Sequence, residues 1–226
     1  NNYTIHVDPS VSKIRPFVTG IIAKNGNVDD NMIKQLMAMQ EDLHFGIGRK
    51  RKKSSIGIHD LDKILFPLTY TTTKKEHKFT PLNSSSELTI SEILTSTDMG
   101  KDYGMILGNS INVPIILDSK KQTVSLPPII NAAVTTVTPK TKNLFVEVTG
   151  INKEDAEDML SVVATILQTA GFTLISTKII GAKNLSPKLE PRKILINSDL
   201  INQTLGLNLS NSQIVTSLKK SRLDAT

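Results

Sequence analysis

The sequence has no cysteine and no tryptophan, and aromatic residues make up only 4% of its 226 positions. Without cysteine there is no disulfide scaffold, thiolate metal site, cysteine nucleophile or thiol redox chemistry. The scarcity of aromatics argues against an aromatic-rich carbohydrate or peptide platform. It also argues against base stacking as the dominant mode of nucleic-acid binding. No apolar run approaches the roughly 18 residues of a membrane-spanning helix, so we expect no membrane partner.

Several catalytic signatures are also missing. There is no glycine-rich phosphate loop, no nucleophile elbow and no zinc-binding pair of His and Glu at helical spacing. The segment His59-Asp60-Leu61-Asp62 holds one imidazole and two carboxylates, for which a structural role is favoured over a metal site. The chain starts at Asn1 without a charged-then-apolar leader, so we expect a piece cut from a longer, cytoplasmic protein.

The positive charge is concentrated in one place. Five of the 27 Lys and Arg residues form the run 49–53, and the others nearly balance the 21 acidic residues. A compact basic cluster suits a phosphate backbone or an anionic carboxylate. The alternative is a solvated loop or helix end. A chain of this length buries a sizeable core as one large domain, or as one domain plus a fragment.

Strand patterns outnumber helix patterns. The apolar spacing predicts strands at residues 3–7, 17–23, 54–58, 113–118, 123–126, 144–148 and 172–180. Residues 65–83 read as loops with short strands. Only one stretch is clearly strand–helix–strand, so we expect an α+β fold with mixed or antiparallel sheets and a few packing helices.

Two long helices are expected within this fold. One is capped by Asp29 or Asp30 and is ended by Gly46 and Gly48, with His44 near its end, where it would favourably meet the helix dipole. The other is capped by Asn152 and stops at Gly171. A polar, proline-containing stretch after residue 181 is a plausible linker, followed by a small helical element at 194–218. Its candidate caps are Asp199 and Ser210.

Four sequence blocks occur in a set order along the chain. They are Ile14-Arg15-Pro16-Phe17, then Arg49-Lys50-Arg51 with Ile56-Gly57-Ile58-His59-Asp60-Leu61-Asp62, then Leu126-Pro127-Pro128-Ile129-Ile130-Asn131, and Phe145-Val146-Glu147-Val148-Thr149-Gly150. Together they resemble the beta subunits of phenylalanyl-tRNA synthetase, of the archaeal and eukaryotic type. The resemblance runs from about Lys13 to Leu218.

The resemblance implies a domain order and a function. It implies a linker strand at 1–12, an editing domain of B3/B4 type at 13–186 and the start of a B5-type domain at 192–226. Such a domain hydrolyses mischarged Tyr-tRNA(Phe) and helps to bind tRNA(Phe), not DNA. The alpha subunit would carry aminoacylation with ATP and Mg²⁺, in a heterotetramer of two alpha and two beta subunits. No cofactor or metal is expected in this fragment.

Glu147 is the strongest candidate for substrate recognition. It lies in an otherwise apolar strand, so an inward carboxylate needs a partner. The resemblance makes it the acid that reads the tyrosine hydroxyl, since a site that hydrogen-bonds this group disfavours phenylalanine. The alternative is simple alternation with Glu147 facing water.

The other candidate residues follow from the resemblance. Asn131 would hold the scissile ester, with Ser125 and Thr149 as small polar neighbours in the pocket and Ile116 as an apolar wall. His59 would act as a general base or hold the terminal ribose. The alternatives are a turn cap for Asn131 and a structural role for His59. For Ser125, Thr149 and Ile116 the alternative is an ordinary strand position.

Arg49, Lys52 and Lys53 suit the phosphates of the tRNA acceptor end. Two other functions stay open. The chain could be an inert module for tRNA positioning or subunit assembly, or a free-standing deacylase. A deacylation assay with Tyr-tRNA(Phe) separates the first from editing.

Overall fold

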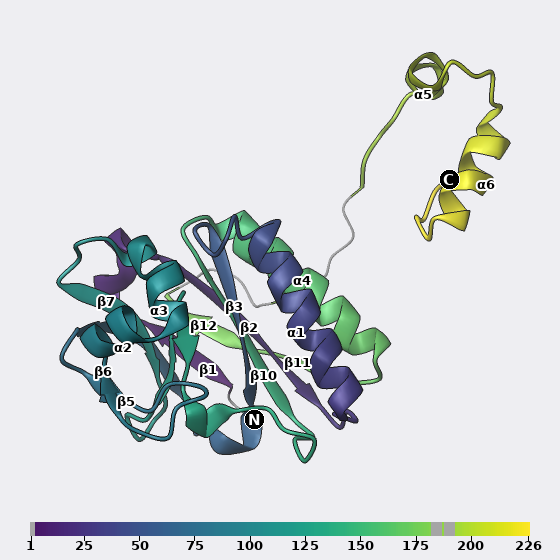
Figure 1. The fold of residues 1–226 in the computed structure, drawn as a ribbon. Helices are drawn as coiled ribbons and strands as arrows, with labels where there is room; N and C mark the ends of the chain where they lie inside the picture. The colour runs from purple at the N-terminus through teal and green to yellow at the C-terminus, as the bar shows by residue number, and fades with distance from the viewer. Residues whose placement is uncertain (1–2, 182–186, 188–192) are drawn as a thin grey trace. The chain divides into compact units, whose positions relative to one another are not determined.

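The computed structural model describes residues 3–181, 187 and 193–226. The chain divides into two compact units, residues 1–189 and 190–226. The first unit combines a six-stranded, a four-stranded and a two-stranded sheet with helices (Figure 1). The expected α+β class is confirmed.

The four-stranded sheet is antiparallel throughout and carries two long helices. Its order is β11 (Thr173–Ser176), β2 (Phe17–Lys24), β10 (Leu144–Gly150) and β3 (Ser54–Asp60). Helices α1 (Asp30–Phe45) and α4 (Lys153–Thr169) run beside each other over one face (Figure 1). The apolar stripe of α4 is buried against this sheet, and all seven residues of the central strand β10 are buried.

The six-stranded sheet contains the amino-terminal strand. Its order is β12 (Lys178–Ile180), β1 (Thr4–Val7), β4 (Leu68–Lys74), β7 (Asn112–Leu117), β8 (Thr123–Leu126) and β9 (Ile130–Asn131). β1 pairs in parallel with both neighbours, and the other pairs are antiparallel. β1 lies within the expected linker strand at 1–12, and its Ile5 is fully buried.

Short elements fill the rest of the first unit. A small hairpin of β5 (Lys78–Phe79) and β6 (Leu88–Thr89) is followed by α2 (Ile90–Ser96) and α3 (Asp98–Tyr103). Among the described residues, 3-10 helices lie at Pro9–Lys13, Leu61–Lys63, Gly104–Leu107 and Ala133–Thr135. The two larger sheets share a core in which Ile22 and Phe145 meet Tyr70 and Ile116.

Two of the expected elements in this unit need correction. Residues 172–180 are not one strand: β11 and β12 belong to different sheets, and between them lies buried Thr177, whose hydroxyl donates to Gly20 O at 2.6 Å. Residues 65–83 hold more than short strands. The threonine-rich segment forms the seven-residue β4, consistent with the preference of β-branched residues for strands.

The second unit contains helices α5 (Ser198–Leu205) and α6 (Asn211–Lys220). Ser210 caps α6 as expected, but Asn197 rather than Asp199 caps α5, because its side chain accepts the Asp199 N–H. Most of the expected linker, residues 182–186 and 188–192, lies outside the described residues. Within the described ranges no helix is long and apolar enough to cross a membrane.

Candidate functional site

A pocket of about 420 Å³ lies beside α1, β3 and the segment that follows β8. Its apolar wall includes Ile33 and Leu36 from α1 and Ile56 from β3. Polar groups from other elements also line it, among them Ser125 and Glu147. A mostly apolar cavity of this size with a few convergent polar groups fits a small ligand.

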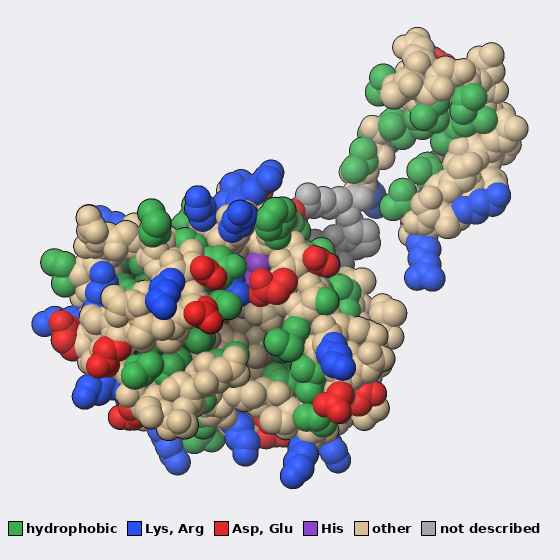
Figure 2. Space-filling view, in the orientation of Figure 1, with side chains coloured by type: hydrophobic (Ala, Val, Ile, Leu, Met, Phe, Trp, Pro, Cys, Tyr) green, Lys and Arg blue, Asp and Glu red, His purple; other side chains and the backbone are tan. Residues whose placement is uncertain are grey.

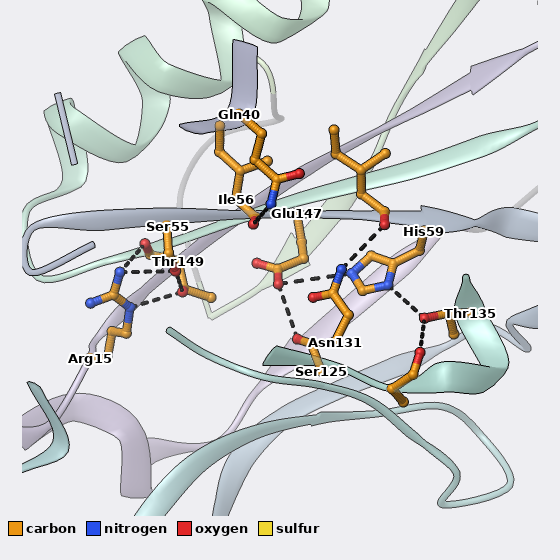
Figure 3. Close-up of polar contacts among 12 residues, drawn as sticks. Arg15, Gln40, Ser55, Ile56, His59, Ser125, Asn131, Thr135, Glu147 and Thr149 are labelled. Atoms are coloured by element: carbon orange, nitrogen blue, oxygen red, sulfur yellow. Dashed lines mark hydrogen bonds and ion pairs between the residues drawn. The ribbon is translucent and has the colours of Figure 1, made fainter. Parts of the chain in front are cut away.

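Glu147 is buried in this pocket, with 2% of its surface exposed. Its Oε1 accepts a hydrogen bond from Ser125 Oγ at 3.0 Å (Figure 3). Its Oε2 is buried and has no hydrogen-bond partner among the described residues. The water-facing alternative is therefore excluded, and a carboxylate oxygen is left for a ligand that donates a hydrogen.

His59 lies beside Glu147 and is completely buried. Its Nδ1 is 2.9 Å from Thr135 Oγ1, which itself donates to Ala132 O at 3.1 Å. The hydroxyl hydrogen is thereby used, so His59 Nδ1 must be the donor to Thr135. The other ring atom, Nε2, lies 4.0 Å from Glu147 Oε1 and has no hydrogen-bond partner within the described part of the chain.

Asn131 completes this group of polar side chains. Its Nδ2 donates to Ile58 O at 3.3 Å, which leaves Oδ1 turned toward the strand position of Gly57. In Figure 3 the side chains of Asn131, His59 and Glu147 point toward one another. Three polar atoms thus meet in one place over Gly57: Glu147 Oε1, the Asn131 amide oxygen and His59 Nε2.

Gly57 makes this convergence possible, and it was missed as a functional position. A Cβ on Gly57 would lie 2.6 Å from both Glu147 Oε1 and His59 Nε2, and 3.1 Å from Asn131 Oδ1. Gly57 pairs directly with Glu147 in the antiparallel ladder between β3 and β10. A glycine inside an apolar strand is the available sequence signal, since it marks a close approach.

Thr149 takes part in a different buried group, centred on Arg15. The Arg15 guanidinium donates to Thr149 Oγ1 at 2.9 Å, to Thr149 O at 2.8 Å and to Ser55 Oγ at 3.2 Å. Burial lowers the pKa of Arg15 to about 10, opposed by the Tyr70 hydroxyl and by the negative charge of Glu147. Thr149 does not line the pocket, although Ser55 does.

Ile116 also lies away from the pocket. It is fully buried in the core between the two larger sheets, where it packs with residues such as Tyr70 and Phe145. The expected pocket position of Ile116 and Thr149 therefore differs from the structure: both are side chains of the interior. Ser125, Asn131 and Glu147 do line the cavity, and His59 lies directly behind them.

The basic run forms the turn between α1 and β3. Arg49, Lys52 and Lys53 are exposed, and Lys53 Nζ is 3.3 Å from Asp155 Oδ2. Arg51 is instead 7% exposed. It donates to Ile129 O and to Glu41 Oε1, both at 2.9 Å, and it lines the pocket. The run thus contains both solvent-facing charges and one structural arginine.

His44, near the end of α1, does not act as a cation facing the helix dipole. It is buried, and its Nε2 accepts the Ile56 N–H at 2.9 Å. Burial, and secondly the charge of Arg51, lower the pKa of His44 to about 4, although Glu41 opposes this. The residue is therefore neutral near pH 7 and joins α1 to β3.

The two aspartates of the segment His59–Asp62 are hydrogen-bonded to the segment before β10. Asp60 Oδ2 accepts from Thr141 Oγ1 at 2.8 Å, and Asp62 accepts from Asn143. Among the described residues no three His, Cys, Asp or Glu side chains are grouped so that they could hold a metal ion.

A family model of the B3/4 domain matches residues 29–161, which is more than half of the chain. The chain belongs to the B3/4 domain family. The match includes β3, β8, β9 and β10, so the residues of the pocket described above lie inside the B3/4 domain.

Relatives of this B3/4 domain extend over nearly the whole chain. The phenylalanine–tRNA ligase beta subunit of Archaeoglobus fulgidus is 39% identical over 97% of this chain and 40% of its own length. That of Methanococcus maripaludis is 40% identical, with coverages of 98% and 40%. The chain thus spans about two fifths of the length of these curated relatives.

A solved structure shows the same fold. An N-terminal fragment of the phenylalanyl-tRNA synthetase beta subunit from Pyrococcus horikoshii superposes with a TM-score of 0.90 at 33% identity. The match covers 95% of this chain and 63% of that chain. The resemblance to these beta subunits, inferred from four sequence blocks, is confirmed.

Proposed function

We propose that the pocket hydrolyses the ester that joins tyrosine to a mischarged tRNA(Phe). The observation that carries this proposal is the buried, unpaired Oε2 of Glu147 in an otherwise largely apolar cavity. A phenolic hydroxyl can donate a hydrogen bond to this oxygen, and the aromatic ring can pack against the apolar wall. The names of the relatives supply phenylalanine and tRNA, and the ester-linked tyrosine is part of the proposal.

Selectivity follows from which groups are left unpaired. Phenylalanine has no hydroxyl, so its binding would keep the Glu147 oxygen buried without a partner. A site that hydrogen-bonds a substrate hydroxyl rejects the analogue that lacks it much more strongly than a difference in volume allows. Glu147 thereby favours the wrong product, Tyr-tRNA(Phe), over the correct one.

The hydrolytic step transfers an acyl group to water. A water oxygen attacks the ester carbonyl carbon, the bond to the ribose oxygen breaks, and that oxygen takes up a proton as tyrosine leaves. Asn131 would hold the substrate near the reacting carbonyl, and His59 would accept a proton or orient the ribose. This division of roles depends on positioning rather than on a protein nucleophile.

The rest of the assembly is proposed from the relatives. Arg49, Lys52 and Lys53 would contact phosphates of the tRNA acceptor end. An alpha subunit would carry aminoacylation with ATP and Mg²⁺ in the cytoplasm, in a complex of two alpha and two beta subunits. An inert module for tRNA positioning or assembly is the competing function.

Replacing Glu147 tests the proposal. In a synthetase with both subunits, Glu147→Gln should slow deacylation of Tyr-tRNA(Phe) while phenylalanine charging stays at the parent rate. Loss of a hydrogen bond to a charged group corresponds to about 1.5–3 kcal/mol, or about 10- to 100-fold. The matched control is Glu154→Gln, since Glu154 is an exposed glutamate on α4.

Three outcomes separate the functions. Selective loss of deacylation in Glu147→Gln supports editing. Equal deacylation in the variant and the parent would mean that Glu147 does not read the hydroxyl. If the parent itself leaves Tyr-tRNA(Phe) intact while charging normally, the domain is an inert module.

A further inference from the structure

Phe45, the last residue of α1, is unusual among the aromatic residues of this chain. The sequence has three tyrosines and six phenylalanines, and all nine lie in the described part. Eight are buried or half-buried, whereas Phe45 is 68% exposed. A large aromatic side chain held in water has no role in the core, so its surroundings decide what it can bind.

The turn that follows Phe45 has a backbone conformation that side chains rarely adopt. Arg49, Lys50 and Arg51 have φ angles of 48°, 54° and 64°, all in the left-handed region. A left-handed residue other than glycine costs of the order of 1 kcal/mol or more, and such geometry is concentrated at functional sites. Something must therefore hold the turn in place.

Arg51 holds the turn from the inside. Its guanidinium donates to Ile129 O and to Glu41 Oε1, each at 2.9 Å, and its central carbon lies 4.3 Å from the centre of the Tyr103 ring. The Arg51 amide also donates to His44 O at 3.3 Å. One buried arginine thus joins the turn to α1, to α3 and to the segment before Asn131.

The neighbours of Arg51 are turned to solvent by this arrangement. Arg49, Lys50 and Lys52 are exposed, and Lys50 Nζ lies 5.6 Å from the centre of the Phe45 ring. Figure 2 shows Lys and Arg side chains gathered over the turn between α1 and β3, next to hydrophobic surface. We call Phe45, Arg49, Lys50 and Lys52 the basic–aromatic patch.

The basic–aromatic patch borders the pocket. Glu41 and Arg51 both line the cavity, and Phe45 follows Glu41 by four residues on α1. Four helical residues span about 6 Å. An extended ligand that leaves the pocket past Glu41 would therefore reach the Phe45 ring within about one helical turn.

We propose that the basic–aromatic patch binds the single-stranded 3′ end of an RNA, with one base stacked on Phe45 and its flanking phosphates held by Arg49, Lys50 and Lys52. This inference rests on the proposed function, because it assigns the path by which the substrate's RNA enters the pocket. A π-face beside a short row of cations is how proteins hold single strands without reading their sequence.

An acidic protein surface is the other partner that a basic patch could take. Arg49, Lys50 and Lys52 could bind either partner. An exposed ring with a cation beside it favours a nucleotide, because the base can stack on the ring while its phosphate pairs with the cation. The pocket next to the patch also favours RNA, since an ester-linked end has to continue out of the cavity.

The test is RNA binding by the chain, measured without catalysis. The probe is a single-stranded RNA ending in CCA-3′, with 2-aminopurine replacing the base next to the terminal adenosine. Phe45→Ala should weaken binding by about 5- to 100-fold, the effect of losing one base–aromatic stack. It should also abolish the change in 2-aminopurine fluorescence that stacking produces.

The salt dependence of the affinity distinguishes the contribution of the Phe45 ring from that of the positive charges. Phe45→Ala should leave the slope of log K against log salt unchanged, because stacking releases no counterions. Lys50→Ala or Arg49→Ala should reduce the slope by about 0.7 for each lost phosphate contact. Phe45→Trp should bind at least as well as the parent, while Phe45→Leu should resemble Phe45→Ala.

Met105→Ala is the matched control, because Met105 is an apolar side chain that is 91% exposed in the 3-10 helix after α3. Unchanged affinity in Phe45→Ala would overturn the proposal, as would parental binding by Phe45→Leu. Weaker assembly with the alpha subunit at unchanged RNA affinity would assign the patch to a protein partner. Failure of editing would appear differently, as normal RNA binding without deacylation.

Discussion

Two buried polar clusters lie on the same pair of strands and are built in opposite ways. Around Arg15, the guanidinium finds oxygen acceptors on Thr149, Ser55 and Lys52. Around Glu147, one carboxylate oxygen is bonded to Ser125 and the other has no hydrogen-bond partner among the described residues. Since Glu147 and Thr149 are two residues apart on β10, the clusters lie about 7 Å apart along the strand.

This difference in hydrogen bonding indicates a different role for each cluster. A buried polar group that is fully hydrogen-bonded holds a unique structure, whereas one left unpaired costs stability and calls for a ligand. We therefore assign the Arg15 cluster to the fold and the Glu147 cluster to binding. Both lie in segments that resemble synthetase sequences, so resemblance alone did not separate them.

The largest effect is expected from breaking the Arg15 cluster. Arg15→Met should lower the free energy of unfolding by about 3–5 kcal/mol, because Thr149 Oγ1, Thr149 O and Ser55 Oγ all lose the donor that they have in the interior. Glu147→Gln keeps the shape of the side chain and should change the free energy of unfolding by less than about 1 kcal/mol. Urea unfolding followed by circular dichroism measures both.

A similar loss of stability in the two variants would contradict the comparison, since both clusters would then be structural. The opposite result, a stable Arg15→Met chain, would mean that water replaces the guanidinium. In either case the assignment of the Arg15 cluster to the fold and of the Glu147 cluster to binding would have to be revised.

The next largest effect concerns the convergence over Gly57. Gly57→Ala places a methyl group 2.6 Å from Glu147 Oε1 and His59 Nε2, so these side chains must move. Misplacement of about 1 Å can cost about 100-fold in rate, so deacylation of Tyr-tRNA(Phe) should fall by about that factor. Steady-state deacylation measures it, with phenylalanine charging as the internal control.

Gly104→Ala provides the comparison, because a Cβ there would meet its nearest neighbour, a leucine side chain, at an ordinary 3.4 Å. We expect parental deacylation in that variant. Parental activity in Gly57→Ala as well would show that the polar side chains need not meet over this glycine.

The two buried histidines extend the comparison, since His44 is hydrogen-bonded and His59 is only partly so. The pKa of His44 falls from 6.5 to about 4 in the fold, chiefly through burial. The unfolded chain therefore binds a proton that the folded chain refuses as the pH falls below 6.5, and stability is lost. Between pH 6.5 and 5 the loss should be about 1–2 kcal/mol.

Urea unfolding of the parent and of His44→Gln at several pH values isolates this contribution. The pKa of His77 is also lowered by burial, so the difference between the two slopes, not the parent slope, is the test. The same slope in both proteins would mean that His44 is not the group responsible.

Sequence patterns predicted the elements of this fold better than its buried polar contacts. The acidic first turn and apolar stripe of α4, and the strands expected at 113–118 and 123–126, depend on neighbours in the chain and were found where expected. Which sheet a strand joins depends on distant residues, so the local pattern predicts one strand at residues 172–180 where the structure has two. The Thr177 bond to Gly20 spans 157 positions and leaves no local pattern.

The same limit applies to the candidate site. Glu147 stands out in the sequence because a carboxylate interrupts an apolar strand, whereas Asn131 is a candidate through the resemblance. Thr149 lies two residues after Glu147, so both side chains are on the same face of β10. The local pattern therefore gives no reason to separate them. Thr149 belongs to the interior cluster because Arg15, which is far away in sequence, donates a hydrogen bond to it.

The smallest effect is expected at Thr135, which orients His59. The Thr135 hydroxyl donates to Ala132 O and accepts from His59 Nδ1, so it fixes the ring with Nε2 toward Glu147. Thr135→Val keeps the shape of the side chain but leaves Nδ1 without this partner, and a turned ring would no longer present Nε2 beside the carboxylate. Deacylation of Tyr-tRNA(Phe) should slow by about tenfold, the value of one hydrogen bond, with KM for the tRNA unchanged.

Thr135→Ser should restore the rate, and Thr138→Val, a change at an exposed threonine nearby, should leave it at the parent value. If Thr135→Val lowers the free energy of unfolding without changing the rate, His59 belongs with the hydrogen-bonded cluster, and Glu147 and Asn131 have to carry the reaction without it.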